Sequence, residues 1–226
     1  MYTQCTDSQI SVATGGVVLE GMLQVPAQPR AVILFAHGSG SSRFSPRNNF
    51  VAGVLRRHNL ATVLIDLLTA SEDQVYETRF DIELLTQRLH SVAEWAKTES
   101  TAKDLPLGLF GASTGAASAL RLAAWLRHGI YAVVSRGGRP DLAEDFLAHV
   151  TAPTLLVVGG KDELVLELNR KAYEQLRTEA ELVIIPGATH LFEEPGTLEA
   201  VAEKATEWFA NHLPSTREAR AAQHAE

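Results

Sequence analysis

The sequence predicts an α/β fold, with a mostly parallel twisted sheet that carries helices on both faces. Short apolar runs rich in β-branched residues alternate along the 226-residue chain with longer segments of helical periodicity. That alternation requires parallel strands joined by right-handed crossovers. A hydrophobic content of 46% and the length are those of one globular unit. We expect residues 1–213 to form a single domain and the charged, alanine-rich residues 214–226 to fray.

The N-terminal part begins with a predicted antiparallel hairpin. Residues 8–13 and 16–25 alternate apolar and polar positions around Thr14-Gly15-Gly16. Residues 31–36 form a continuous apolar run, which is typical of a strand covered on both faces. A loop rich in glycine and serine then extends over residues 37–49, too polar and too irregular to serve as packing filler.

The later elements alternate strictly in type. Apolar residues at helical spacing predict helices, and short apolar runs predict buried strands. In chain order we expect a helix over 50–60, a strand over 61–68, a helix over 80–97, a strand over 105–110, a helix that ends near 128, a strand over 131–134, a helix over 142–150, a strand over 154–158, a helix over 165–177, a strand over 182–186 and a helix over 197–212. The short connection over 138–150 leaves no room for a large cap domain.

Composition narrows the classes of function. The formal charge of −7 provides no basic stripe for nucleic acid. No run approaches the ~20 apolar residues that span a bilayer, and the N-terminus lacks a secretory signal pattern. We therefore expect a cytoplasmic protein without nucleic-acid or membrane partners, and the oligomeric state stays open. Cys5 is the only cysteine, so neither an internal disulfide nor a thiolate metal site can form.

The segment Gly111-Ala112-Ser113-Thr114-Gly115 lies between a predicted strand and a predicted helix. A sharp turn from strand to helix strains the backbone of its central serine and exposes the hydroxyl, and the two glycines relieve the crowding around it. The N-terminus of the following helix favours negative charge beside that hydroxyl. A G-x-S-x-G pentapeptide also occurs by chance in many proteins. The strand and helix predicted on either side of this one are what make Ser113 a candidate nucleophile.

Candidate partners of Ser113 follow the last two predicted strands. A serine hydroxyl needs a base that is oriented by a carboxylate, and His190 and Asp162 would supply these at the same edge of the sheet. Asp141, after the preceding strand, competes with Asp162, which is favoured because Gly159-Gly160 provides a tight turn. The other histidines after the glycine-rich loop are weaker candidates for the base than His190. They lie in predicted helices, at helix ends or in the tail: His58, His90, His128, His149, His212 and His224.

An oxyanion hole is expected from main-chain donors. These would be the N–H of Thr114 and one N–H after His37, from Gly38 or Ser39. Such a donor is typically worth roughly 3 kcal/mol in the transition state.

Four arginines, Arg43, Arg47, Arg136 and Arg139, lie in loops of this edge. One hypothesis is that Arg43, Arg47 or Arg136 meets an anionic group on the substrate by paired hydrogen bonds. The alternative is that these arginines form structural ion pairs with residues such as Asp66 or Asp141.

Five motifs carry a resemblance to a known family: HGSGSSRFSPRN, GASTGA, SRGGRPDL, GGKDELV and GATHLF. With them, residues 31–212 resemble the small α/β-hydrolases of the dienelactone hydrolase family, in which the order serine, aspartate, histidine recurs. The resemblance implies hydrolysis of a carboxylic ester or lactone without a cofactor. The namesake enzymes use a cysteine nucleophile where this chain has Ser113, so we do not expect dienelactone itself to be the substrate.

We therefore expect a serine esterase for small acyl groups that acts through an acyl-enzyme. Acyl transfer, perhydrolysis or cleavage of a carbon–carbon bond on the same three residues are alternatives, as is a non-catalytic binding protein that retains the fold. A metal hydrolase is disfavoured, since no H-x-x-x-H or comparable ligand cluster appears.

Overall fold

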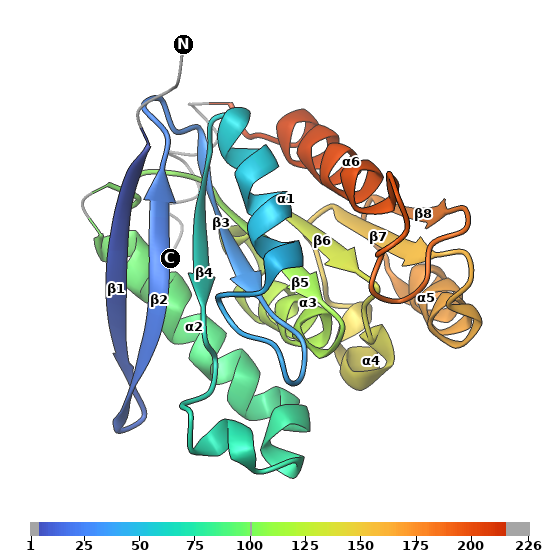
Figure 1. The fold of residues 1–226 in the computed structure, drawn as a ribbon, viewed down its shortest axis with the longest axis horizontal. Coiled ribbons are helices and arrows are strands. Elements are labelled where there is room, and N and C mark those ends of the chain that lie inside the picture. The colour runs from blue at the N-terminus through green and yellow to red at the C-terminus, as the bar shows by residue number, and fades with distance from the viewer. Residues whose placement is uncertain (1–4, 100, 216–226) are drawn as a thin grey trace.

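The computed structural model describes residues 5–99 and 101–215, which form a twisted eight-stranded sheet with helices on both faces (Figure 1). The strand order is β1-β2-β4-β3-β5-β6-β7-β8. An antiparallel N-terminal hairpin joins the sheet through β2 and β4, and all pairs from β4 to β8 are parallel. The strands are β1 (Thr6–Thr14), β2 (Val17–Val25), β3 (Ala31–Ala36), β4 (Leu60–Ile65), β5 (Leu107–Ala112), β6 (Ala132–Arg136), β7 (Thr154–Gly159) and β8 (Ala180–Ile185). The predicted fold class is confirmed.

The helices divide between the two faces of the sheet, and each group closes its own apolar core. On one face lie α1 (Pro46–Arg57) and α6 (Thr197–Asn211). On the other lie α2 (Ile82–Thr98), α3 (Thr114–Leu126), α4 (Glu144–Leu147) and α5 (Glu163–Gln175). Short 3-10 turns occupy Glu72–Gln74, Glu77–Phe80, Arg127–Gly129 and Pro140–Ala143.

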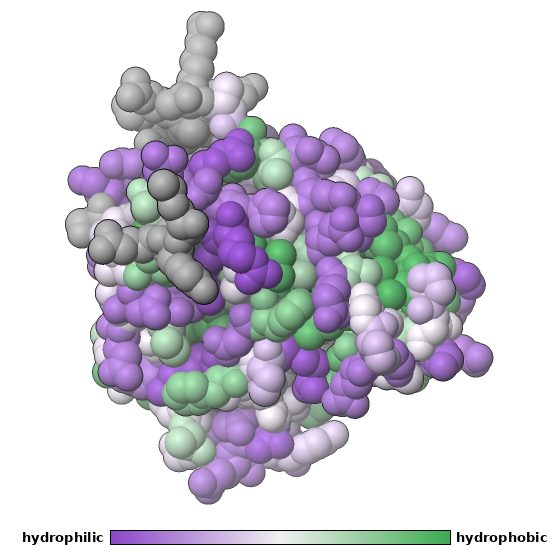
Figure 2. All heavy atoms as spheres, turned by 45° about the horizontal axis from the view of Figure 1, so that its top comes forward, coloured by the Kyte–Doolittle hydropathy of each residue, from purple (hydrophilic) through white to green (hydrophobic). Residues whose placement is uncertain are grey.

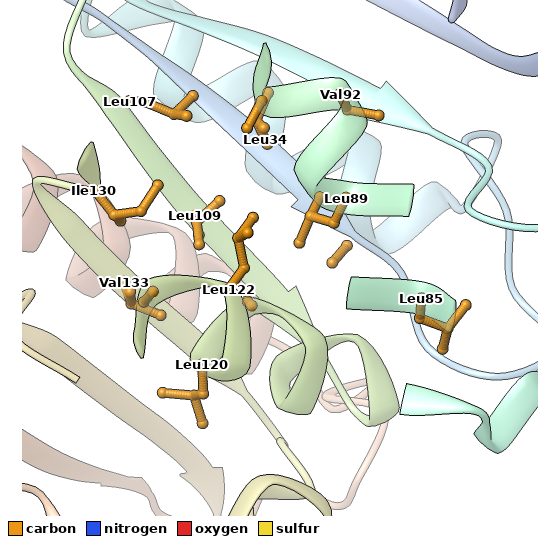
Figure 3. Packing of buried hydrophobic residues seen from close by; sticks show 14 of the residues in the cluster. Leu34, Leu85, Leu89, Val92, Leu107, Leu109, Leu120, Leu122, Ile130 and Val133 are labelled. Atoms are coloured by element: carbon orange, nitrogen blue, oxygen red, sulfur yellow. The ribbon is translucent and has the colours of Figure 1, made fainter. Parts of the chain in front are cut away.

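The core under α2 and α3 fixes the position of the strand that leads to Ser113. Leu89 of α2 and Leu122 of α3 pack with Leu34 of β3 and Leu109 of β5 in one fully buried cluster (Figure 3). Burial of one such leucine is worth about 2 kcal/mol relative to its exposed state. The end of β5 and the start of α3 are therefore held rigidly against the sheet.

Helix α1 begins at Pro46, four residues earlier than the predicted start at residue 50. The side chain of Ser45 accepts a hydrogen bond from the N–H of Asn48, and Pro46 occupies the first helical turn, where its missing N–H costs nothing. The glycine- and serine-rich loop is correspondingly shorter than predicted.

Other elements also differ from the prediction. Strand β4 ends at Ile65, three residues before the predicted end at residue 68. Strand β6 continues to Arg136 instead of ending at residue 134, because Ser135 and Arg136 pair with β7. The helix predicted over 142–150 is replaced by the 3-10 turn Pro140–Ala143 and the short helix α4. The connection between β6 and β7 therefore contains no larger structured insertion among the described residues.

Polar side chains cover much of the face in Figure 2, and an apolar area lies on its right, where Figure 1 places β7, β8 and α6. Strand β8 is the edge of the sheet and exposes Ile184. Within residues 5–99 and 101–215 no helix has the length and apolar character needed to cross a bilayer. Most of the predicted tail, residues 216–226 with His224, lies outside the described residues.

Candidate active site

Ser113 occupies a strained turn between β5 and α3. Its backbone angles are φ 51° and ψ −122°, a conformation that costs a non-glycine residue about 1–3 kcal/mol. A methyl group on Gly111 would lie 2.4 Å from Cα of Ala116, and one on Gly115 would lie 2.2 Å from the carbonyl oxygen of Ala36. The predicted crowding around the serine is confirmed, since neither glycine has room for a side chain.

Hydrogen bonds to the end of β6 hold this turn in place. The N–H of Ser113 donates to the carbonyl oxygen of Arg136 at 3.2 Å, and the N–H of Arg139 donates to the carbonyl oxygen of Ser113 at 3.0 Å. Ser113 is thus fixed to the segment that connects β6 with the following 3-10 turn. The tertiary contacts, not local preference, maintain the strained backbone.

His190 and Asp162 lie in contact with each other. Nδ1 of His190 is 2.6 Å from Oδ2 of Asp162, and since a carboxylate only accepts, Nδ1 carries the proton and Nε2 is left free to accept one. The two turns that carry them pack directly, because a methyl group on Gly159 would lie 2.5 Å from the carbonyl oxygen of Ala188. The N–H of Lys161 also donates to that oxygen at 2.9 Å.

Asp141, the competing carboxylate, is engaged elsewhere. Its two oxygens accept hydrogen bonds from Nε and Nη2 of Arg139 at 2.8 and 2.7 Å. This bidentate pair raises the pKa of Arg139. The geometry therefore assigns the carboxylate beside His190 to Asp162, which the sequence favoured without excluding Asp141.

Ser113 and His190 both adjoin the dipeptide Arg136-Gly137. The carbonyl of Arg136 accepts from Ser113, and a methyl group on Gly137 would lie 3.5 Å from Nδ1 and Cε1 of His190. A direct hydrogen bond between the Ser113 hydroxyl and His190 is not among the contacts of the described residues. Their pairing therefore stays a prediction, and such bonds often tighten only when substrate is bound.

The loop after β3 packs against the nucleophile candidate. A methyl group on Gly38 would lie 2.9 Å from Cβ of Ser113, so this loop approaches closely only because residue 38 is glycine. The N–H of Ser39 donates to the hydroxyl of Thr114 at 2.8 Å. Sequence reasoning did not anticipate this bond, which holds the Ser39 N–H at the N-terminus of α3.

His37 has a structural position in the same loop. Its Nε2 accepts from the N–H of Leu67 at 3.4 Å, and its Nδ1–H donates to the carbonyl oxygen of Gly38 at 3.0 Å. The ring thereby ties the loop after β3 to the segment after β4. Two of the other histidines also have structural contacts: His90 stacks on Trp125, and Nδ1 of His212 lies 2.8 Å from the carbonyl oxygen of Trp208.

The arginines of this edge differ in their pairing. Arg43 forms an ion pair with Asp66 and lies 4.5 Å from the ring centre of Phe44, which is the structural role considered as the alternative. Arg47 donates from Nη1 to Glu193 at 3.2 Å. Arg136 is buried, and its Nη1 has no hydrogen-bond partner.

Arg136 is the last residue of β6, so the direction of its side chain follows the alternation of that strand. Alternation along the strand places it on the same face as Val134, toward α1 and α6. Burial, with the positive charge of Arg47 as a second cause, lowers the pKa of Arg136 to about 10. The guanidinium therefore stays charged at neutral pH.

A groove of about 480 Å³ adjoins the loop after β3, and Ser41, Phe44, Asp66 and Thr69 are among its lining residues. A larger groove of about 580 Å³ lies around Trp125 between α2, α3 and α4, and none of the predicted site residues lines it. Among residues 5–99 and 101–215, no group of three His, Cys, Asp or Glu side chains is placed to hold a metal ion.

Comparison with solved structures relates the chain to known hydrolases. A dienelactone hydrolase from Anabaena variabilis is 52% identical with a TM-score of 0.91, and the match covers 93% of this chain and 100% of that one. Est1E from Butyrivibrio proteoclasticus, also solved with ferulic acid bound, is 20% identical with a TM-score of 0.79 over 90% of this chain and 98% of its own. At that identity, the second match shows the fold alone.

Two curated proteins of Mycobacterium tuberculosis, from strains CDC 1551 and H37Rv, are each 54% identical over 207 residues. Both are named "Putative phosphoribosyl transferase". The match covers 92% of this chain and 47% of each relative, so the chain spans about half the length of the curated relatives it matches.

A family model described as an alpha/beta hydrolase domain matches residues 29–215, which includes every strand from β3 onward and all six helices. The resemblance predicted from the five sequence motifs is confirmed by this match and by the similarity to the Anabaena protein. The chain belongs to the alpha/beta hydrolase family, as a small member similar to dienelactone hydrolase.

Proposed function

We propose that the protein hydrolyses carboxylic esters or lactones with small acyl groups, without a cofactor, through Ser113, His190 and Asp162. The observation that carries this proposal is the 2.6 Å contact between Nδ1 of His190 and Oδ2 of Asp162, beside a serine held in a strained turn. A fixed carboxylate leaves Nε2 of the imidazole as the acceptor for a serine proton. Similarity to a dienelactone hydrolase supports hydrolysis of an ester or lactone.

In the first half of the reaction, Oγ of Ser113 attacks the substrate carbonyl while its proton passes to Nε2 of His190. Asp162 stabilises the imidazolium that results. The tetrahedral oxyanion accepts hydrogen bonds from the N–H of Thr114 and from an N–H of Gly38 or Ser39. The hydrogen bond from Ser39 to the Thr114 hydroxyl keeps the Ser39 N–H near α3. To bind the oxyanion, this N–H would either donate to both oxygens or break its hydrogen bond to Thr114.

Collapse of this intermediate breaks the ester bond, and His190 gives its proton to the leaving alkoxide. In the second half, water attacks the acyl-enzyme, His190 takes a proton from that water, and the carboxylic acid is released with Ser113 restored. The connection between β6 and β7 is short, which supports an open site for small acyl groups rather than long lipids.

The test is the turnover of 4-nitrophenyl acetate by the wild type and by Ser113→Ala. Loss of the nucleophile is expected to lower kcat by at least about 10⁴-fold. Ser8→Ala, an exposed serine of β1, is the matched control. Mass spectrometry after labelling with a fluorophosphonate should place the adduct on Ser113. If Ser113→Ala turns over the ester at the wild-type rate, the proposal is wrong.

Acyl transfer and perhydrolysis use the same acyl-enzyme and differ only in the acceptor. Turnover in the presence of a short alcohol or hydrogen peroxide, with analysis of the products, separates them from hydrolysis. We expect the free acid to be the main product. An ester or peracid as the main product at low acceptor concentration would favour the transferase alternative.

The name of the Mycobacterium relatives describes proteins about twice as long as the match. The segment they share with this chain coincides with the alpha/beta hydrolase match, and we infer that the transferase name refers to their other half. Accordingly, the chain is expected to release no diphosphate from phosphoribosyl diphosphate in the presence of nucleobases. Release that survives Ser113→Ala would contradict this inference.

A further inference from the structure

Arg136 carries a buried positive charge. The residue is 8% exposed, and its Nη1 is enclosed without a hydrogen-bond partner. Within the described part of the chain, no carboxylate forms an ion pair with its guanidinium. An unpaired buried charge is strongly unfavourable, so such groups are normally paired or bind a ligand.

Arg47, in the first turn of α1, adds a second positive charge to this edge of the sheet. After burial, its charge is the second cause of the lowered pKa of Arg136. Nε of Arg47 is also buried without a partner. Among the described residues, the one ionic partner of Arg47 is Glu193, which contacts Nη1. The side chain of Glu193 is 63% exposed, so it contributes little neutralisation in water.

The other arginines show that the chain normally pairs such groups. Arg88, 5% exposed, donates to both oxygens of Glu72 at 3.2 and 2.7 Å. Arg139 is held by Asp141 in a bidentate pair. The lack of a carboxylate at Arg136 is therefore specific to this position and leaves donors free.

Arg136 lies directly beside the candidate active site. Its carbonyl oxygen accepts from the N–H of Ser113, and the next residue, Gly137, packs against the ring of His190. Glu193, the partner of Arg47, follows His190 by three residues. The backbone at Arg136 thus adjoins Ser113 and His190, and Arg47 is tied through Glu193 to the segment that follows His190.

We propose that Arg136 and Arg47 form a binding site for an anionic group, a carboxylate or a phosphate, carried by the substrate of Ser113. This rests on the proposed ester hydrolysis. The free Nη1 of Arg136 and Nε of Arg47 are the donors. Guanidinium donors suit both oxyanions, and the low-polarity surroundings of Arg136 strengthen the contact. The chain would then select acidic esters over neutral esters of the same length.

The first experiment measures this selection. Mono-4-nitrophenyl succinate, glutarate and adipate are compared with the neutral 4-nitrophenyl esters of equal chain length, and a phosphonate-bearing ester replaces the carboxylate in a parallel set. The ratio of kcat/KM for the acidic ester to that for the neutral ester is expected to fall at least tenfold in Arg136→Met. Arg136→Lys should recover part of that ratio, since it keeps the charge.

Arg139→Gln is the matched control, because it removes a positive charge of the same edge that Asp141 already neutralises. Its ratio should stay within about twofold of the wild type, a change smaller than 0.5 kcal/mol. The proposal is overturned if Arg136→Met loses acidic and neutral esters equally, or if Arg139→Gln lowers the ratio as much. Preference for the carboxylate or for the phosphonate set identifies the oxyanion.

A binding measurement keeps the proposal testable if the esters are not substrates. Glutarate and inorganic phosphate, added at constant ionic strength, should raise the Tm of the wild type by mass action, and Arg136→Met or Arg47→Met should abolish the rise. Equal shifts in wild type and both variants would refute the anion site. Failure of Ser113→Ala to lower ester turnover would instead refute the proposed hydrolysis, and the anion site would then stand or fall with the binding measurement alone.

Discussion

Gly115→Ala tests how closely α3 approaches β3 beside Ser113. The new methyl group would lie 2.2 Å from the carbonyl oxygen of Ala36 and 2.5 Å from that of His37. Carbon–oxygen contacts are normally about 3.3 Å or longer, so helix and strand must separate by roughly 1 Å. Both obstacles are main-chain atoms, and neither can turn aside as a flexible side chain would.

The expected cost follows from that separation. Overpacking of a rigid site costs about 1–3 kcal/mol, and the helical preference of alanine returns up to about 1 kcal/mol. We therefore expect a net loss of about 1–2 kcal/mol. For a chain of this length, that lowers Tm by roughly 2–8 °C. Turnover should fall further than stability requires, since the shift displaces Ser113 and would disturb the proposed pairing of its hydroxyl with His190.

Gly53→Ala in α1 provides the matched control. Its nearest neighbours are the ends of the Arg56 and Arg57 side chains at 3.6 and 3.9 Å, which can move. This substitution should raise Tm by about 2–4 °C through helix propensity alone. Thermal unfolding followed by circular dichroism, with ester turnover on the same samples, provides both readouts. A Gly115→Ala protein that melts within 1 °C of the wild type at full activity would refute the reasoning.

Two further predictions concern charged pairs. Asp162→Asn should lower kcat about 10³–10⁴-fold, because an amide cannot hold the His190 tautomer, whereas Asp141→Asn should change kcat less than about threefold; the reverse result would move the acid to Asp141. Hydrogen bonds from Arg88 lower the pKa of Glu72, so that pair stabilises the fold above pH 4.5 and its contribution is lost as the pH falls through the lowered pKa. Glu72→Gln should therefore cost about 1–2 kcal/mol in urea unfolding at pH 7 and progressively less as the pH falls through the lowered pKa, and a cost that does not change with pH would contradict the assignment.

The order of strands and helices could be predicted because each buried strand is a continuous apolar run and each helix has an apolar stripe. The start of α1 was missed although Ser45 and Pro46 are ordinary signals for a helix N-terminus, since the preceding glycines and serines suggested an extended loop. The end of β6 was missed for the opposite reason. A charged residue, Arg136, reads as a loop residue even though it pairs with β7.

The residues of the candidate site and the preference for Asp162 as the partner of His190 could be predicted from the sequence, but the exclusion of Asp141 could not. Ser113, Asp162 and His190 could be found because each follows a strand at one edge of the sheet. The sequence could not exclude Asp141, because the order of the strands does not show that Arg139 pairs with this carboxylate. The bond from Ser39 to Thr114 joins residues 75 positions apart, and no local pattern reports it.

The short connection between β6 and β7 has a consequence for the fate of an acylated serine. Among the described residues, this connection holds only a 3-10 turn and a four-residue helix, so nothing there shields a bound acyl group from bulk water. To engineer ester synthesis in place of hydrolysis, one would therefore first insert a cap segment into this connection that limits the access of water. The nucleophile would be left unchanged.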